Sequence, residues 1–160
     1  MNKFLRLLTI GVVLAFGAAA AASAASGADP IIGTWTVNLD KSKFHDNRAP
    51  KSMTRTYTAV AGGTEMKTTG VASDGTPISQ SATLTYDGKD SPVTGSSEFD
   101  TLSLKKINGT TVKAQLKKDG KVVGNTTRTV SGQGKVLTLS TAMKTAKGGT
   151  AHDVAVFDKQ

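Results

Sequence analysis

The chain has 160 residues, a formal net charge of +8 at pH 7 and no cysteine. The lack of cysteine excludes a disulfide framework, a cysteine nucleophile and a lipoprotein attachment site. The length suits one domain that buries a real core.

The first 24 residues have the composition of a secretory signal. Lys3 and Arg6 precede the apolar run 7–22, and Ala22-Ser23-Ala24 fits the specificity of signal peptidase. The run is shorter than the roughly 20 residues that span a bilayer, so we expect cleavage before Ala25 and no membrane span afterwards. The alanine-rich style is typical of bacteria and predicts a periplasmic or secreted protein. The expected division is a signal peptide, 1–24, and one barrel domain, 25–160.

Cleavage removes two positive charges and no negative one, which takes the formal charge from +8 to +6. The remaining lysines recur at strand ends and turns, as at Lys105-Lys106 and Lys117-Lys118. One interpretation is that these lysines keep the protein soluble and prevent edge-to-edge pairing of strands between molecules. The alternative is that they attract an anionic partner. We expect no nucleic acid partner, because the mature chain has few aromatic side chains on which bases could stack.

Short segments of alternating polar and apolar residues fill the mature chain and predict β-strands. In the first segment, 34–39, Trp35, Val37 and Leu39 share a face. Residues 41–51 then break the alternation and predict a long connection with a helical turn. Further strands are expected at 52–60, 65–72, 78–86, 100–107, 110–117, 121–131, 135–143 and 151–158.

Turn residues separate these segments. Asn108-Gly109 predicts a two-residue type I′ turn, because both central positions of that turn need positive φ. Asp119-Gly120 predicts the next hairpin. Residues 86–90 predict a turn as well, and 92–98 are expected to be irregular. In the last segment, Val154 and Val156 share the predicted core face with His152.

Consecutive hairpins favour an all-β fold, a single up-and-down antiparallel barrel of about eight strands. A sandwich stays open as the alternative, because 41–51 and 91–98 are long enough to hold a crossover.

Gly33-Thr34-Trp35 resembles the Gly-x-Trp signature of lipocalins and related calycin barrels. The resemblance implies that Trp35 is a structural anchor across the closed end of the barrel, covered by a basic side chain from a late strand, for which we expect Arg128. The mature chain is also similar to uncharacterised exported bacterial proteins. These open with Gly-Thr-Trp-x-x-Asn-x-x-Lys-Ser and carry a Tyr-Asp-Gly-Lys turn and a Lys-x-Gly-Lys-Val hairpin, found here at 86–89 and 118–123.

The candidate ligand-binding residues are Arg55, Tyr57, Tyr86 and Arg128. Arg55 shares a strand face with Tyr57, and a guanidinium inside a barrel binds a carboxylate through two hydrogen bonds. The alternative interpretation is that Arg55 and Tyr57 form a surface pair.

No catalytic, metal or cofactor site is predicted. The only histidines lie in His45-Asp46 and His152-Asp153, and neither pair has the spacing of a zinc motif; whether the two pairs converge in space stays open. No serine lies in a Gly-x-Ser-x-Gly nucleophile elbow.

The leading hypothesis is an exported, non-enzymatic barrel, a monomer or weak oligomer, that binds a small apolar or amphipathic molecule. An envelope interaction or inhibitor module that uses its turns and lysine-rich strands is the second hypothesis. The third is an enzyme that uses a histidine or arginine lining the barrel.

Overall fold

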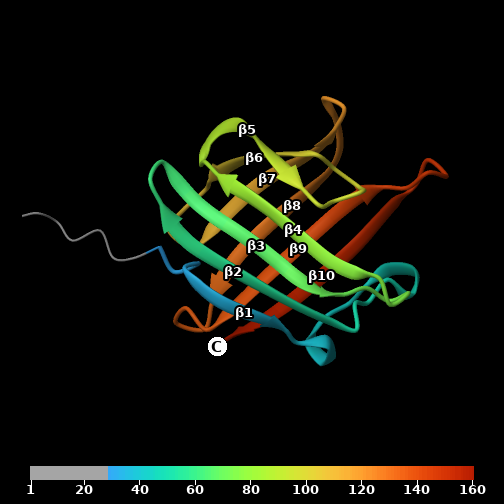
Figure 1. The fold of residues 1–160 in the computed structure, drawn as a ribbon, viewed down its shortest axis with the longest axis horizontal. Helices are drawn as coiled ribbons and strands as arrows, with labels where there is room; N and C mark the ends of the chain where they lie inside the picture. The colour runs from blue at the N-terminus through green and yellow to red at the C-terminus, as the bar shows by residue number, and fades with distance from the viewer. Residues whose placement is uncertain (1–28) are drawn as a thin grey trace, which may run out of the picture.

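The computed structural model describes residues 29–160, so the predicted signal peptide lies outside the described residues. Ten antiparallel strands form one sheet that closes on itself (Figure 1). Their bounds are β1 Gly33–Val37, β2 Ser52–Val60, β3 Gly63–Val71, β4 Pro77–Leu84, β5 Asp87–Thr94, β6 Thr101–Lys106, β7 Thr111–Lys118, β8 Lys121–Ser131, β9 Val136–Lys144 and β10 Thr150–Lys159. Each strand pairs with its neighbours in sequence, and β1 also pairs with β10. The predicted up-and-down barrel is therefore confirmed, with ten strands instead of about eight.

The sequence pattern did not predict strand β5. The prediction of a turn at 86–90 and an irregular segment at 92–98 was wrong for Asp87–Thr94, which pairs with β6. Gly88 has a φ of 81°, and the register shifts between Asp87 and Asp90, so the glycine accommodates a bulge inside the strand. Pro92 lacks an N–H, but β5 pairs with β4 only through Val93 and Thr94, so no bond of that ladder is lost at Pro92.

The first strand is shorter than the alternation predicts. β1 ends at Val37, and Leu39, expected in the core, is 42% exposed in the 3-10 helix η1, Leu39–Lys41. The Asn38 side-chain oxygen accepts a hydrogen bond from the Lys41 N–H (3.1 Å) and so caps η1. A polar residue at the cap outweighs the periodicity, because it satisfies an N–H that a short helix leaves unpaired.

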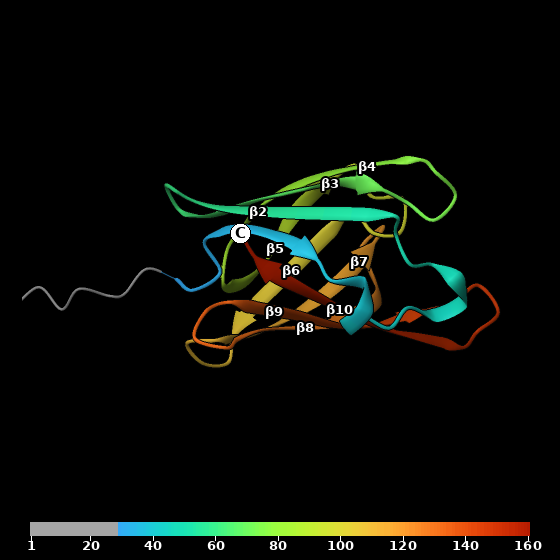
Figure 2. The same ribbon diagram turned by 90° about the horizontal axis from the view of Figure 1, so that it is seen from below.

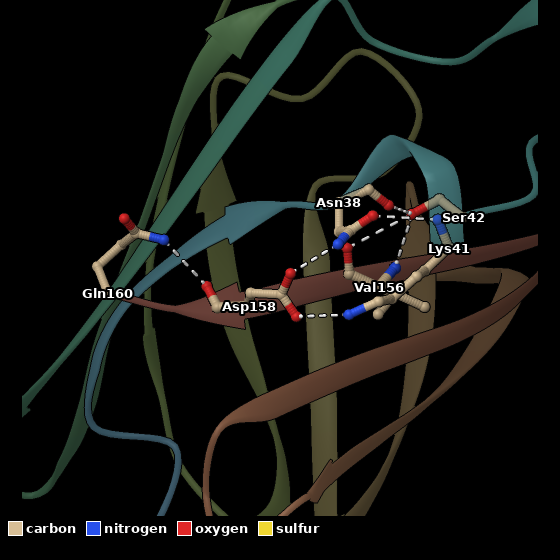
Figure 3. A network of polar contacts seen from close by, with 6 residues as sticks. All are labelled: Asn38, Lys41, Ser42, Val156, Asp158 and Gln160. Atoms are coloured by element: carbon tan, nitrogen blue, oxygen red, sulfur yellow. Dashed lines mark hydrogen bonds and ion pairs between the residues drawn. The ribbon is translucent and has the colours of Figure 1, made fainter.

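Polar contacts fix this turn to the last strand (Figure 3). The Asn38 amide donates to Asp158 Oδ2 (2.6 Å), and the Lys41 ammonium lies 3.3 Å from Asp158 Oδ1. Ser42 Oγ donates to the Asn38 carbonyl (2.6 Å) and accepts from the Val156 N–H (2.9 Å). The connection after β1 is thereby held against the outside of β10.

The connection between β1 and β2 covers one end of the barrel. It contains η1 and a second 3-10 helix, η2, His45–Asn47, which confirms the predicted helical turn. Both lie at the end that carries the β3–β4 and β9–β10 hairpins, whereas the lead-in to β1 and the β2–β3 hairpin lie at the opposite end (Figure 2). We call the first end the mouth and the second the closed end.

The two expected hairpins differ in their backbone. Asp119 and Gly120 have φ values of 50° and 73°, as a type I′ turn requires. The type I′ prediction for Asn108-Gly109 was wrong, because neither residue has positive φ. Instead, Asn108 Oδ1 accepts hydrogen bonds from the Thr110 and Thr111 N–H groups (3.0 and 2.8 Å), so the side chain organises the turn.

The inward face of β10 is the opposite of the predicted one. Phe157 is fully buried and Ala151 nearly so, whereas His152 is exposed. Because side chains alternate along a strand, Val154 and Val156 share the outward face with His152. Their partial burial comes from the connection after β1, which pairs with Val154 through Lys43.

One cluster of buried apolar side chains fills much of the barrel. Its largest members with almost no exposure are Trp35, Tyr57, Phe157, Ile31, Leu84 and Leu137. Within residues 29–160, no helix has the length and apolar character needed to cross a membrane.

Candidate ligand-binding site

The closed end is organised by Trp35, which is fully buried. Its indole Nε1 donates to the Ile31 carbonyl (2.7 Å), so the ring is anchored to the lead-in before β1. The cation over the ring is the Lys159 ammonium, 5.0 Å from the ring centroid, and not Arg128 as expected. The register explains this, because Lys159 is paired directly with Trp35 across β1 and β10.

Arg128 instead lies between two tyrosine rings. It is 6% exposed, and its Cζ lies 5.5 Å from the Tyr57 ring centroid and 5.3 Å from that of Tyr86. Its Nη2 donates to Tyr86 Oη (3.0 Å). The Lys106 ammonium lies 4.6 Å from the Tyr86 centroid, so Tyr86 contacts two cations.

Asp29 adds one negative charge at this end. It pairs with Lys106 (2.9 Å) and accepts a hydrogen bond from the Ile31 N–H (3.2 Å). Partial burial raises the pKa of Asp29, but these hydrogen bonds outweigh it, so the pKa lies below its ordinary value. The carboxylate therefore stays ionised and fixes the lead-in beside the arginine and tyrosine cluster.

A cavity of about 370 Å³ lies inside the barrel. Its walls are mainly apolar, and side chains from both halves of the sheet contribute. The apolar lining residues include Met53, Tyr57, Met66, Leu84, Leu102, Leu104, Leu116, Leu139, Met143 and Phe157. The volume falls within the range of about 300–1,000 Å³ that is typical of small-molecule sites.

Arg55 supplies a positive charge to the cavity wall. Its Cζ lies 5.8 Å from the Phe157 ring centroid, and Nη1 lies 3.9 Å from Met66 Sδ. Nε is buried without a hydrogen-bond partner in the part of the chain that the structure describes. No carboxylate among residues 29–160 forms an ion pair with Arg55 or with Arg128, which also lines the cavity. The cavity thus has two guanidinium groups, neither of which is ion-paired to a carboxylate of the described residues.

Polar groups on the opposite wall were missed by the sequence analysis. Thr126, Thr141 and Asp153 line the cavity, and the Thr126 and Thr141 hydroxyls are 2.9 Å apart. The period of two places Thr126 on the face of Arg128, so this residue could have been found. Asp153 was missed because the predicted inward face of its strand was wrong.

A solvent-exposed ion pair lies at the mouth. Arg48, after η2, pairs with Glu98 in the connection between β5 and β6, and both residues line the cavity. The His45 N–H donates to Asp153 Oδ1 (2.7 Å), so η2 is tied to the cavity wall as well. Phe44 and Phe99 add aromatic surface at the same place. The connection between β1 and β2 thereby serves as a lid over the cavity.

The predicted ligand-binding residues come together in part. Arg55, Tyr57 and Arg128 line the cavity. Tyr86 does not line it, but its hydroxyl accepts a hydrogen bond from Arg128. The two His-Asp pairs are brought near one another by the hydrogen bond from the His45 backbone N–H to the Asp153 carboxylate. Across residues 29–160, no group of three or more histidine, cysteine or acidic side chains is arranged to hold a metal ion.

No protein-family model and no curated protein matches the sequence. Among solved structures, the barrel is similar to zebrafish ileal bile acid-binding protein complexed with cholic acid, with a TM-score of 0.52 and 14% identity over 82% of this chain and 99% of that one. This chain shares the fold of that barrel. A redesigned β-barrel, mFAP1, bound to DFHBI, is similar at a TM-score of 0.45 and 14% identity, over 81% of this chain and 95% of that one. Both neighbours were solved with a small molecule.

Proposed function

We propose that this protein binds a small, partly apolar molecule that carries one anionic group, and that it does so inside the barrel without catalysis. The observation that carries the proposal is Arg55, a guanidinium in an apolar-walled cavity with no carboxylate paired to it among residues 29–160. Arg55 is partly buried, and its Nε is buried without a hydrogen-bond partner, which is unfavourable; a ligand carboxylate beside the guanidinium reduces that penalty.

Charge distribution supports an orientation for the ligand. Arg55 and Arg128 are the cations of the deeper cavity, while the acidic lining residues, Glu98 and Asp153, lie with the lid contacts. An anionic head group is therefore attracted inward, and the apolar part lies against the leucine and methionine side chains. Lipocalin-like binding of this kind agrees with the shared fold, which on its own says nothing about the ligand.

We further propose that binding takes place outside the cytoplasm, in the periplasm or in the medium. This part rests on the composition of residues 1–24, where two basic residues precede an apolar run and a small-residue cleavage site. The measurement is N-terminal sequencing of the protein recovered from the periplasm of a bacterial host. Recovery of the uncleaved chain from the cytoplasm alone contradicts the proposal.

The first test identifies what the barrel carries. Native mass spectrometry of the protein from the periplasm, followed by denaturing extraction, should show a stoichiometric small molecule with an acidic group. A neutral or cationic molecule in the extract contradicts the assignment of the head group.

The second test uses defined probes. A saturated medium-chain carboxylate should displace a fluorescent apolar probe at a concentration about tenfold lower than the alcohol of the same length, because a hydrogen bond to a charged group is the stronger. Arg55→Met, similar in length but uncharged, should abolish the difference. Lys113→Met removes an exposed charge outside the barrel and should leave it intact. Displacement by neither probe from a folded barrel overturns the proposed function.

A further inference from the structure

Two rows of polar side chains lie on opposite walls inside the barrel. The first row crosses β2, β3 and β4, where Arg55 is paired with Thr68 and Thr68 is paired with Gln80. The second crosses β8, β9 and β10, where Thr126 is paired with Thr141 and Thr141 with Asp153. In a closed barrel of this order, β2–β4 and β8–β10 form opposite walls, and Figure 2 shows them as its upper and lower layers.

The first row has unused hydrogen-bonding capacity. Thr68 is 1% exposed, and its Oγ1 has no hydrogen-bond partner among residues 29–160. Arg55 Nε is also buried without a hydrogen-bond partner among these residues. Arg55 and Gln80 both line the cavity. Buried polar atoms without partners are rare in folded proteins. Of the two residues that carry them here, Arg55 lines the cavity, so its guanidinium is the place in this row where a ligand group completes the bonding.

The second row carries a charge of the opposite sign. Asp153 Oδ1 accepts one bond from the His45 N–H, and a carboxylate has room for several more. The Thr126 and Thr141 hydroxyls bond to each other (2.9 Å), and Thr126 Oγ1 lies 3.3 Å from the Ser140 carbonyl. Each hydroxyl keeps acceptor capacity toward the cavity. This wall therefore favours a ligand group that donates a hydrogen bond.

The two rows are offset along the barrel. Arg55 Cζ lies over the Phe157 ring, and Asp153 precedes Phe157 by four positions on the same strand, toward the mouth. Four positions span about 13 Å at about 3.3 Å per residue. A ligand that reaches both rows therefore has its two polar groups at different depths, separated by an apolar part.

We infer that the ligand carries a second polar group, a hydroxyl or another neutral donor, which binds at Asp153, Thr141 and Thr126 while the anion binds at Arg55. The inference rests on the proposed function and defines its ligand class as a hydroxylated amphipathic acid. A plain alkyl chain against the second row would take water away from Asp153 and the threonines and return no hydrogen bond, which is unfavourable. A second carboxylate would be repelled by Asp153.

The experiment compares saturated carboxylates of medium and long chain length with their terminally hydroxylated analogues, by displacement of a fluorescent apolar probe. At the length that spans both rows, the hydroxylated acid should bind about tenfold more tightly than the plain acid. The dicarboxylate of that length should bind more weakly than either.

Three variants locate the effect. Thr141→Val and Thr126→Val keep the side-chain shape and remove a hydroxyl from the second row. Each should reduce the advantage of the hydroxylated acid, with affinity for the plain acid unchanged or raised, because the plain chain no longer takes water away from that hydroxyl. Thr127→Val changes the neighbouring outward position on β8 and should alter neither affinity. Circular dichroism and cooperative unfolding confirm that each variant is folded.

The outcomes separate this inference from the proposed function. If plain acids bind and the hydroxylated acids bind no better at any length, the inference is wrong and the proposed function stands. An advantage that survives both threonine substitutions also overturns it. If no acid of either series displaces the probe from the folded wild-type barrel, the proposed function fails and the inference fails with it.

Discussion

Arg55 and Thr68 are paired across β2 and β3, and each has one buried polar atom, Nε and Oγ1, without a hydrogen-bond partner among residues 29–160. Such a pair reduces stability, since the hydrogen bonds that these two atoms made to water in the unfolded chain are not replaced in the folded barrel. Stability and binding therefore place opposite demands on these two positions.

The first prediction concerns the stability of variants at Thr68 and Arg55. Thr68→Val replaces an unpartnered hydroxyl by a methyl group of the same shape, and we expect the free energy of unfolding to rise by about 1 kcal/mol. Arg55→Met should leave it unchanged or raise it by a similar amount, because the guanidinium has no ion pair to lose. Urea denaturation of the ligand-free proteins measures both effects. A loss of several kcal/mol in either variant would show that the atoms are satisfied in solution.

The second prediction is that Arg128, although it lines the same cavity, is needed for stability. Arg128→Met removes a hydrogen bond to Tyr86 and the contacts with the Tyr57 and Tyr86 rings, and we expect a loss of about 2–4 kcal/mol in the free energy of unfolding.

Tyr86→Phe separates the two contributions of this cluster. It removes only the hydroxyl that accepts from Arg128 and should cost about 1 kcal/mol. An Arg128→Met protein as stable as Arg55→Met would contradict the distinction between an unpartnered and a fully packed guanidinium.

Alternation along the chain was enough to predict which strand faces point inward for much of the barrel, including Arg55 and Tyr57. It failed at β5, where Gly88 and Pro92 are locally typical of a turn, although pairing with β6 makes the segment a strand. It also failed at β10, because the outward valines are covered by the connection after β1, a contact that no local pattern encodes.

In the candidate site, too, some features follow from local sequence and others depend on how the strands pair. The cation over Trp35 depends on the register that pairs Lys159 with Trp35, and register is a property of the closed sheet. The resemblance to calycin barrels predicted a basic side chain from a late strand, and this is the role that Lys159 fills. The second polar row could not be assembled from sequence, because Thr126, Thr141 and Asp153 are brought together only by the pairing of β8, β9 and β10.

The third prediction tests the packing behind the cavity wall. Gly124 is buried, and a Cβ there would overlap the Met143 sulfur and lie 2.7 Å from the Ala142 carbonyl oxygen. Gly124→Ala should therefore cost about 1–3 kcal/mol and push Met143 toward the cavity, which reduces the size of ligand accepted. Gly109→Ala is the control, since its Cβ would meet no atom within 4 Å and its φ is not positive. Equal thermal unfolding temperatures for the two variants would contradict the close approach.

The fourth prediction is a pH dependence of stability that arises at Asp158. The hydrogen bond from the Asn38 amide, and to a smaller extent that from the Lys41 ammonium, holds the pKa of Asp158 below its ordinary value of 3.8 (Figure 3). A pKa lowered by folding means that the ionised carboxylate stabilises the folded state above the ordinary value, and that this contribution is lost as the pH falls through the folded pKa.

Asp158→Asn should therefore be less stable than wild type at neutral pH, and the difference in the free energy of unfolding should shrink as the pH falls below about 4. Urea denaturation across the acid range measures it. Gln160→Ala is the control, because the Gln160 side chain donates to the Asp158 backbone carbonyl, and its removal leaves the carboxylate contacts in place. A difference that stays constant with pH would mean that the carboxylate gains nothing from Asn38 and Lys41 on folding, and that the turn after β1 is held to β10 by Ser42 and by the backbone hydrogen bonds of Asn38 and Lys43.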